Sequence, residues 1–291
     1  MEQMSQVTQT LKIIECPRDA MQGWKTFIPT EKKIAYINQL LQVGFDTIDF
    51  GSFVSPKAIP QMSDTKEVID HLSMEKTNTK LLAIVANVRG ATDAAGYDKI
   101  TYLGFPFSIS PTFQLRNTNS TIEQSLDHVK EMKSICDKKS KQLVIYISMA
   151  FGNPYGDAYS KSIVFEWLDK LVHEGIAIIS LADTVGIATP GQVSEIIKEV
   201  IQAFPDQEIG AHLHSTHTNR QQKIDAALEQ GCRRFDGAIK GIGGCPMAND
   251  VLVGNMDTEW MMHYFEQKKI LPEINKNAFA ESVRLAGEIF I

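Results

Sequence analysis

Eight short segments rich in β-branched and other apolar residues alternate with longer segments whose apolar residues recur three and four positions apart. The first pattern is typical of buried β-strands, and the second is typical of amphipathic helices. The predicted strands cover residues 11–15, 47–50, 80–85, 99–103, 143–148, 178–181, 208–213 and 234–238. The predicted helices cover residues 31–43, 65–74, 92–97, 121–138, 160–174, 192–203 and 220–230. This repeated alternation predicts a parallel sheet closed into a (β/α)8 TIM barrel, an α/β fold.

An open, doubly wound sheet would show a similar alternation of strands and helices. Such a sheet more often carries a Gly-rich phosphate-binding turn after its first strand. Here the first predicted strand is followed by Cys16-Pro17-Arg18-Asp19. The closed barrel is therefore the favoured interpretation.

The chain has 291 residues, which would suit two average domains or one barrel. It contains no internal repeat, low-complexity tract or linker-like segment. We therefore predict a single TIM-barrel catalytic domain over residues 1–291, with the barrel at about 8–254 and a helical extension at about 255–291. Helices are expected over 257–267 and 277–289 of this extension, packed on the barrel or on a partner subunit in a homodimer.

The charge of the chain restricts its partners. Lys and Arg number 29 against 35 Asp and Glu, a net charge of −6, so no basic excess exists to bind nucleic acid. An anionic small substrate would need a local cationic site. Residues 1–10 are polar, and no apolar run approaches the roughly 20 residues of a membrane span. We expect a cytoplasmic protein without a membrane partner, whose four cysteines are thiols.

Polar residues gather where the predicted strands end. In TIM barrels the active site is built at the C-terminal ends of the strands. The residues found at these ends are Arg18 and Asp19 after the first strand, Asp49 in the second, Asp183 after the sixth, His212 and His214 at the seventh, and Cys245 after the eighth. The sequence therefore predicts one catalytic rim.

His212-Leu213-His214 is the most specific local motif. Residues i and i+2 of a strand point to the same side, so both imidazoles can face one point. Asp19 could add an anionic oxygen and Asn255 an amide oxygen, and such mixed nitrogen and oxygen ligation favours Mg²⁺ or Mn²⁺ over a thiolate zinc site. Taken alone, the motif is equally consistent with two solvated or core-bonded histidines.

The remaining rim residues allow two interpretations each. Cys245, in a loop with Gly241, Gly243 and Gly244, is either a thiol for acid–base chemistry or part of a tight turn. Arg18 is either an electrophile for a developing enolate oxygen or half of a structural ion pair. The carboxylate of Asp183 is either catalytic or a cap for the following helix.

Five segments resemble the 3-hydroxy-3-methylglutaryl-CoA lyase family, within the DRE-TIM metallolyase superfamily. They are residues 17–19 (PRD), 52–57 with 60–62 (SFVSPK, PQM), 180–191 (SLADTVGIATPG), 211–214 (AHLH) and 243–246 (GGCP). The FVSPK and GGCP segments are specific to the lyase branch, whereas the Arg-Asp pair and the HxH motif are shared more widely. The chain departs from the family at Asp49, where Glu is usual, and at Cys16, where Gly is usual, which indicates a divergent, bacterial-type branch.

The resemblance implies a carbon–carbon lyase that cleaves 3-hydroxy-3-methylglutaryl-CoA to acetyl-CoA and acetoacetate, chemistry of leucine degradation. It implies a divalent cation, Mg²⁺ or Mn²⁺, and an acyl-CoA substrate. The implied metal ligands are Asp19, His212, His214 and Asn255. The implied catalytic residues are Arg18 for the enolate, Asp183 with Asp49 for the hydroxyl proton, and Cys245 for the enolate carbon.

Two alternatives stay open at this point. One is an enzyme of the same superfamily that condenses acetyl-CoA with a 2-oxo acid, or a related acyl-CoA lyase. The other is a non-catalytic metal-binding barrel.

Overall fold

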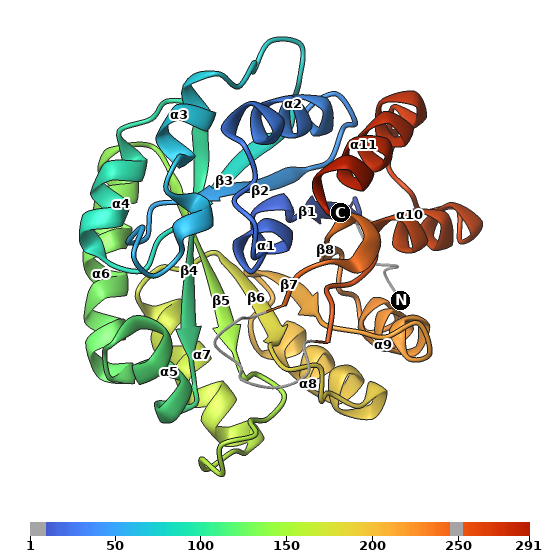
Figure 1. The fold of residues 1–291 in the computed structure, drawn as a ribbon. Coiled ribbons are helices and arrows are strands. Elements are labelled where there is room, and N and C mark those ends of the chain that lie inside the picture. The colour runs from blue at the N-terminus through green and yellow to red at the C-terminus, as the bar shows by residue number, and fades with distance from the viewer. Residues whose placement is uncertain (1–9, 245–252) are drawn as a thin grey trace, which may run out of the picture.

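The computed structural model describes residues 10–244 and 253–291. Its eight parallel strands close into a barrel in the order β1-β2-β3-β4-β5-β6-β7-β8, and helices surround it (Figure 1). The strands are β1 (Lys12–Glu15), β2 (Thr47–Ser52), β3 (Lys80–Ile84), β4 (Ile100–Ser108), β5 (Gln142–Ser148), β6 (Ile178–Asp183), β7 (Glu208–Leu213) and β8 (Arg234–Gly237). The predicted (β/α)8 barrel is confirmed.

The helices alternate with these strands. They are α1 (Pro17–Gln22), α2 (Thr30–Leu40), α3 (Thr65–Asp70), α4 (Val88–Ala95), α5 (Pro111–Thr118), α6 (Ile122–Lys138), α7 (Lys161–His173), α8 (Pro190–Ala203), α9 (Arg220–Leu228), α10 (Thr258–Gln267) and α11 (Lys276–Ile289). Two 3₁₀ turns, η1 (Pro60–Met62) and η2 (Ile239–Gly241), follow β2 and β8. None of these described helices is long and apolar enough to cross a membrane.

The sequence pattern missed two short helices and half of one strand. Helices α1 and α5 span six and eight residues and begin with Pro17 and Pro111, too short for a clear helical period. Strand β4 continues past the predicted end at residue 103 to Ser108 because it stays paired with β5 through Gly104 and Pro106. Those two residue types usually end a strand. At position 104 a Cβ would lie 2.7 Å from Ile84 Cδ1, so a larger residue would require the side chains of the crowded barrel interior to shift.

Two hydrophobic cores hold the barrel. The larger one lies between the strands and the helices, where side chains such as Leu81, Leu103 and Ile145 are fully buried. A smaller cluster fills the inside of the barrel, because its members alternate with these residues along the strands. It consists of Leu82, Ile84, Tyr102, Val144, Tyr146 and Ile178.

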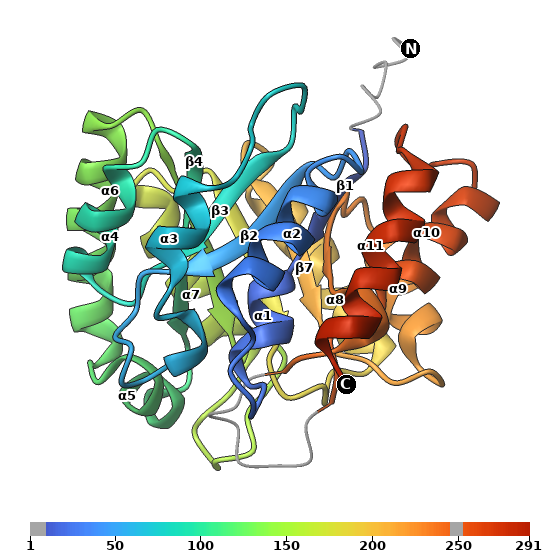
Figure 2. The ribbon, with the colours of Figure 1, turned by 45° about the horizontal axis from the view of Figure 1, so that its top comes forward.

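The two C-terminal helices pack on the barrel of their own chain. Helix α11 lies beside α2 in both ribbon views (Figures 1 and 2). The Phe290 ring makes edge contacts with Trp24 and Tyr36 at centroid distances of 5.3 and 6.4 Å, and Phe279 contacts Phe45 at 6.2 Å. Of the two positions predicted for these helices, the structure shows the one on the barrel.

Candidate metal centre and active site

Helix α1 carries two charged residues into the C-terminal end of the barrel. Pro17 occupies the first helical position, where a fixed φ and a missing N–H favour helix initiation. Arg18 and Asp19 follow in the first turn, and both are buried, with 8% and 7% of their surface exposed. The helix begins two residues after β1 ends, so these side chains stay close to the C-terminal end of that strand.

Asp19, His212 and His214 form a group that could hold a metal ion. One ligand atom from each residue lies within 4.8 Å of the others. The two histidine rings, two residues apart at the end of β7, have centroids 5.3 Å apart. Burial and His212 lower the pKa of His214 to about 3, so this imidazole is neutral. Burial raises the pKa of Asp19, but Arg18 and the two histidines outweigh that effect and lower it overall, so the carboxyl is ionised.

Asn255 lies against this group. Its Nδ2 atom donates hydrogen bonds to Asp19 Oδ2 at 2.6 Å and to the Ile242 carbonyl at 2.9 Å, and its backbone forms a bridge with His214. The amide oxygen is then the atom available to a cation. One carboxylate, two imidazoles and an amide oxygen form a donor set that fits a divalent cation.

Asp236 orients His212 and was not identified from the sequence. Its Oδ2 atom lies 3.0 Å from Nδ1 of His212, and its side chain is fully buried. Burial lowers the pKa of His212, but the bond to Asp236 outweighs it, so the net shift of the His212 pKa is upward. A carboxylate on Nδ1 fixes the ring and leaves Nε2 for a ligand, an arrangement typical of metal-binding histidines. The alternation along β8 was the available signal, since Asp236 lies two residues beyond Arg234 on the same face.

Arg18 joins Asp49 to Asp19. Its Nε atom lies 3.2 and 3.0 Å from the two Asp49 oxygens, and its Nη2 also donates to Asp49. Its Nη1 donates to Asp19 Oδ1 at 3.0 Å and to Gln22 Oε1 at 2.9 Å. Of the five N–H groups of an arginine, one on Nη2 therefore has no acceptor among the described residues. Burial raises the pKa of Asp49 to about 6, against the opposing effect of Arg18.

Asp183 forms a separate buried ion pair beside the group. Its Oδ2 atom accepts a hydrogen bond from Lys223 Nζ at 2.6 Å, and its Oδ1 accepts one from the Ala188 N–H at 3.0 Å. Asp183 does not cap α8, because Thr189 does so with Gln192 in a capping box. Lys223 also reaches the His214 carbonyl at 2.9 Å, which connects Asp183 to the metal ligands. Lys223 was not identified from the sequence, and its place on the buried side of α9 was the available signal.

Cys245 lies outside the described residues. The loop before it approaches the site closely, since a Cβ on Gly243 would lie 2.5 Å from Asn255 Nδ2 and 2.9 Å from the Asp19 carbonyl. Gly243 and Gly244 both have positive φ angles, of 108° and 133°. Glycine is therefore required there by contact and by backbone conformation.

Glu15 supports the start of that loop from outside the barrel. Its oxygens accept hydrogen bonds from the Ile239 N–H at 2.9 Å and from the Thr258 hydroxyl at 2.6 Å. Burial raises the pKa of Glu15 to about 8. This carboxyl joins β1 to η2 and α10, which flank the loop on both sides.

A cavity of about 450 Å³ adjoins the site. It lies between the loop after α1 and the glycine loop after η2. Its lining includes Ala20, Trp24, Lys25, Ile242 and Gly243. Asp19 precedes Ala20 in the chain, so the cavity wall begins next to the metal group.

The chain is thus a TIM barrel with a candidate metal centre at its C-terminal rim, formed by Asp19, His212 and His214. The chain belongs to the HMGL-like family, whose sequence profile matches residues 11–285. It is 33% identical over 264 residues to the cytoplasmic 3-hydroxy-3-methylglutaryl-CoA lyase of Rattus norvegicus, covering 90% of this chain and 76% of that one. It is 34% identical to the hydroxymethylglutaryl-CoA lyase YngG of Bacillus subtilis, covering 87% of this chain and 84% of the relative.

The same family appears among solved structures. An HMG-CoA lyase from Acinetobacter baumannii, in complex with coenzyme A and 3-methylmalate, superposes with a TM-score of 0.90 at 34% identity and covers 99% of this chain and 93% of that one. The HMG-CoA lyase of Bacillus subtilis gives a TM-score of 0.89 at 32% identity, covering 96% and 93%. The resemblance drawn from the sequence motifs is confirmed.

Proposed function

We propose that this protein is a divalent-cation-dependent carbon–carbon lyase that cleaves 3-hydroxy-3-methylglutaryl-CoA to acetyl-CoA and acetoacetate. The observation that carries the proposal is the group of Asp19, His212 and His214, all within 4.8 Å and in contact with Arg18 through Asp19. This group occurs in a chain about one-third identical to named HMG-CoA lyases over most of its length.

Asp19, His212 and His214, with the amide oxygen of Asn255, would hold Mg²⁺ or Mn²⁺. When bound, the cation would lower the pKa of the substrate hydroxyl and stabilise negative charge on oxygen. The protein holds these ligands in the states that binding needs, an ionised carboxylate and a neutral His214.

Two carboxylates are placed to take the hydroxyl proton. Asp49 has a pKa near 6, close to the working range of a general base, and it contacts Arg18 beside the metal group. Asp183 is paired with Lys223, which also bonds to the His214 carbonyl. As the proton leaves, the carbon–carbon bond breaks, acetoacetate forms, and the electron pair of that bond becomes the enolate of acetyl-CoA.

Arg18 stabilises that enolate. Its remaining Nη2 N–H can donate to the enolate oxygen, while Asp49 and Asp19 hold the guanidinium in place. A single donor of this kind is worth about 10²- to 10³-fold in turnover. Cys245, carried by the glycine loop, would deliver a proton to the enolate carbon directly or by relay, and this completes acetyl-CoA.

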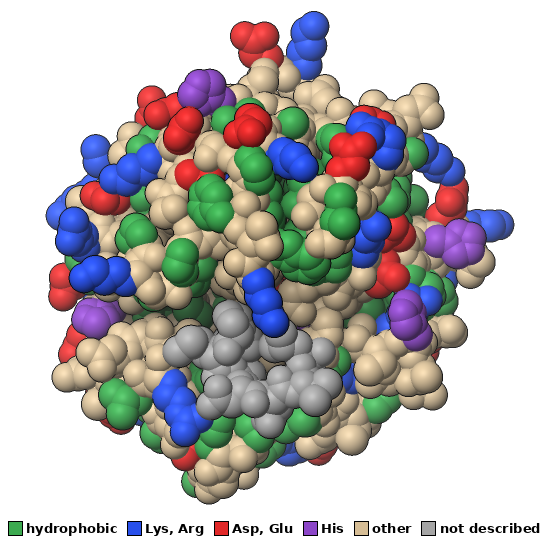
Figure 3. Space-filling view, in the orientation of Figure 1, with side chains coloured by type: hydrophobic (Ala, Val, Ile, Leu, Met, Phe, Trp, Pro, Cys, Tyr) green, Lys and Arg blue, Asp and Glu red, His purple; other side chains and the backbone are tan. Residues whose placement is uncertain are grey.

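The cavity beside the site suits the coenzyme A part of the substrate. Its volume of about 450 Å³ and its Trp24 side chain offer an apolar surface, and Lys25 offers a cation to phosphate groups. Figure 3 shows Lys and Arg interspersed with Asp and Glu over one face, without a continuous basic patch. Lys25 in the cavity lining and Arg18 beside the metal group are the cations that we propose for an anionic thioester. The A. baumannii relative is described in complex with coenzyme A.

The proposal extends to location and assembly. The rat relative is named as a cytoplasmic form, and we propose the same location here. A homodimer remains our prediction, to be checked by light scattering of the purified protein.

The test is product analysis. The protein is incubated with 3-hydroxy-3-methylglutaryl-CoA and Mg²⁺ or Mn²⁺, and in parallel with acetyl-CoA and 2-oxo acids. The proposal predicts acetyl-CoA and acetoacetate in equal amounts from the first mixture only. Condensation products from the second mixture, without cleavage in the first, would support the synthase alternative. A protein that is inactive in both mixtures would support the alternative of a non-catalytic metal-binding barrel.

A further inference from the structure

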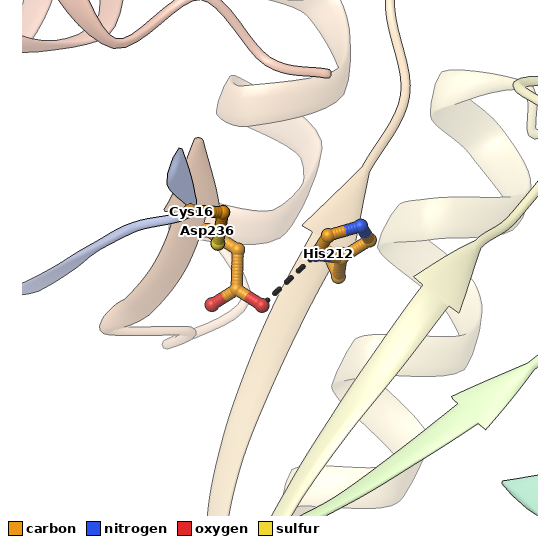
Figure 4. A group of neighbouring side chains, drawn as sticks. All are labelled: Cys16, His212 and Asp236. Carbon is orange, nitrogen blue, oxygen red and sulfur yellow. Dashed lines mark hydrogen bonds and ion pairs between the residues drawn. The ribbon is translucent and has the colours of Figure 1, made fainter. Parts of the chain in front are cut away.

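A second group of possible metal ligands lies behind His212. It consists of Cys16, His212 and Asp236, and one ligand atom from each lies within 4.8 Å of the others. Figure 4 shows the three side chains, with Asp236 directed toward His212. They come from the end of β1, from β7 and from β8. The group is distinct from the one with Asp19 and His214 but shares His212 with it.

The polar atoms of this group are poorly satisfied. Asp236 Oδ1 is buried and has no hydrogen-bond partner among the described residues, although Oδ2 of the same carboxylate is bound to His212. Cys16 is 1% exposed, and among the described residues its sulfur makes only one hydrogen bond, a long one of 3.8 Å to the Ile14 carbonyl. A buried carboxylate oxygen without a donor is costly, so the unpaired Oδ1 atom of Asp236 points to a ligand that the protein can accept.

We propose that Cys16, His212 and Asp236 form an inhibitory site for a thiophilic divalent cation such as Zn²⁺. A sulfur, an imidazole nitrogen and a carboxylate oxygen are the ligands that Zn²⁺ prefers, whereas Mg²⁺ and Mn²⁺ favour sites richer in oxygen. The Cys16 sulfur is the ligand that would make this group prefer Zn²⁺, and the group with Asp19 has no sulfur.

The ligand atoms lie near the separations that a zinc ion requires. Zinc bonds of about 2.0 to 2.3 Å in a tetrahedron place ligand atoms about 3.3 to 3.7 Å apart. His212 Nδ1 and Asp236 Oδ2 are already 3.0 Å apart, and the widest separation in the group is at most 4.8 Å. A separation of 4.8 Å would have to shorten by about 1 Å for its two ligand atoms to bind one ion.

Occupation of this site excludes the catalytic cation. The bound ion takes Nδ1 of His212, so the ring proton moves to Nε2 and that nitrogen can no longer bind a metal beside Asp19. The Cys16 thiol releases its proton to solvent as the sulfur–metal bond forms. The inhibition depends on the proposed lyase activity, but the binding does not.

Co²⁺ is the probe, because a cobalt–thiolate bond gives a near-ultraviolet charge-transfer band that oxygen and nitrogen ligands do not give. The full-length protein is titrated with Co²⁺, alongside Cys16→Ala, Cys245→Ala and Cys136→Ala. Cys136 is a buried thiol in α6 and serves as the matched control. The proposal predicts the band in the wild type and in the last two variants, and its loss in Cys16→Ala. A missing band in the wild type, or one lost with Cys245→Ala and kept in Cys16→Ala, would overturn it.

Two further measurements complete the test. X-ray absorption at the zinc edge of the unmutated protein should show one sulfur neighbour, which keeps the test valid if Cys16→Ala does not fold. The Zn²⁺ concentration that halves Mg²⁺-supported cleavage, measured against each variant's own rate without Zn²⁺, should rise at least about tenfold in Cys16→Ala. Only oxygen and nitrogen neighbours at the zinc edge would contradict the proposal. If the cobalt band is normal but neither the wild type nor any variant cleaves the thioester, the metal site is supported and the lyase function is refuted.

Discussion

Lys223 and Asp183 form a buried ion pair at the active-site end of the barrel. Their side chains are 0% and 1% exposed, and Nζ lies 2.6 Å from Asp183 Oδ2. The ammonium also donates to the carbonyls of His214 at 2.9 Å and Gly186 at 3.1 Å. All three of its N–H groups are therefore used.

Lys223→Met removes the charge and keeps most of the side-chain volume. Asp183 then retains one hydrogen bond, from the Ala188 N–H, and remains a buried carboxylate without a counter-ion. Loss of one partner of a buried pair costs about 3 to 5 kcal/mol. At about 2 to 4 °C per kcal/mol for a domain of this size, we expect the Tm to fall by about 10 °C. The double variant Lys223→Met/Asp183→Leu should recover part of this loss, because no unpaired charge remains.

Calorimetry of the four proteins of this cycle measures the coupling directly. Lys161→Met is the matched control, because Lys161 bonds to Glu195 and Glu199 on the surface and its loss should barely change the Tm. A Lys223→Met protein that melts within a degree or two of Lys161→Met would refute the reasoning. So would a double variant less stable than Lys223→Met alone.

Three further predictions concern the site. Asp236→Ala should weaken Mn²⁺ binding about tenfold to hundredfold in titrations followed by electron paramagnetic resonance, since His212 loses the carboxylate that orients it; unchanged affinity would contradict this role. The kcat/KM of cleavage should rise with pH through about 6 as Asp49 loses its proton, and Asp49→Asn should remove that limb while leaving a low residual rate; an unaltered limb would assign it to another group. The Glu15 pKa is raised from 4.5 to about 8 by folding, so its contribution to stability is complete below about pH 4.5 and is lost as pH rises to 8. In denaturant unfolding, the free energy of unfolding of Glu15→Gln should therefore increase relative to that of the wild type as the pH rises from 5 to 9. A constant difference between the two proteins over this pH range would exclude the raised pKa of Glu15.

The barrel and the charged rim were predictable from the sequence because both follow from periodicity. Alternation of strands and helices determines the closed barrel, and the barrel directs every strand end to one rim. Arg18, Asp19 and the two histidines of β7 could be placed together on that basis alone. The lengths of α1 and β4 were not predictable, since short helices and an interior glycine and proline give no periodic signal.

The supporting residues were not predictable for a different reason. Asp236, Lys223 and Glu15 act through partners that lie 24, 40 and 243 residues away along the chain. A single sequence does not show that a charged residue is buried. These three residues can be buried because the fold brings each of them to a hydrogen-bond or ion-pair partner. The residues of the rim are therefore predictable from local sequence pattern, whereas the buried residues that orient them are determined by tertiary contacts.

The central claim is that a divalent cation bound by Asp19, His212 and His214 supports cleavage of the thioester. It is tested by measuring acetoacetate released from 3-hydroxy-3-methylglutaryl-CoA by the chelator-treated protein while Mn²⁺ is added back. Activity should be absent without Mn²⁺ and should rise in proportion to bound Mn²⁺, up to one ion per chain, whereas His214→Ala should neither bind the ion tightly nor recover. Cleavage at an undiminished rate in excess chelator, or full activity in His214→Ala, would contradict it.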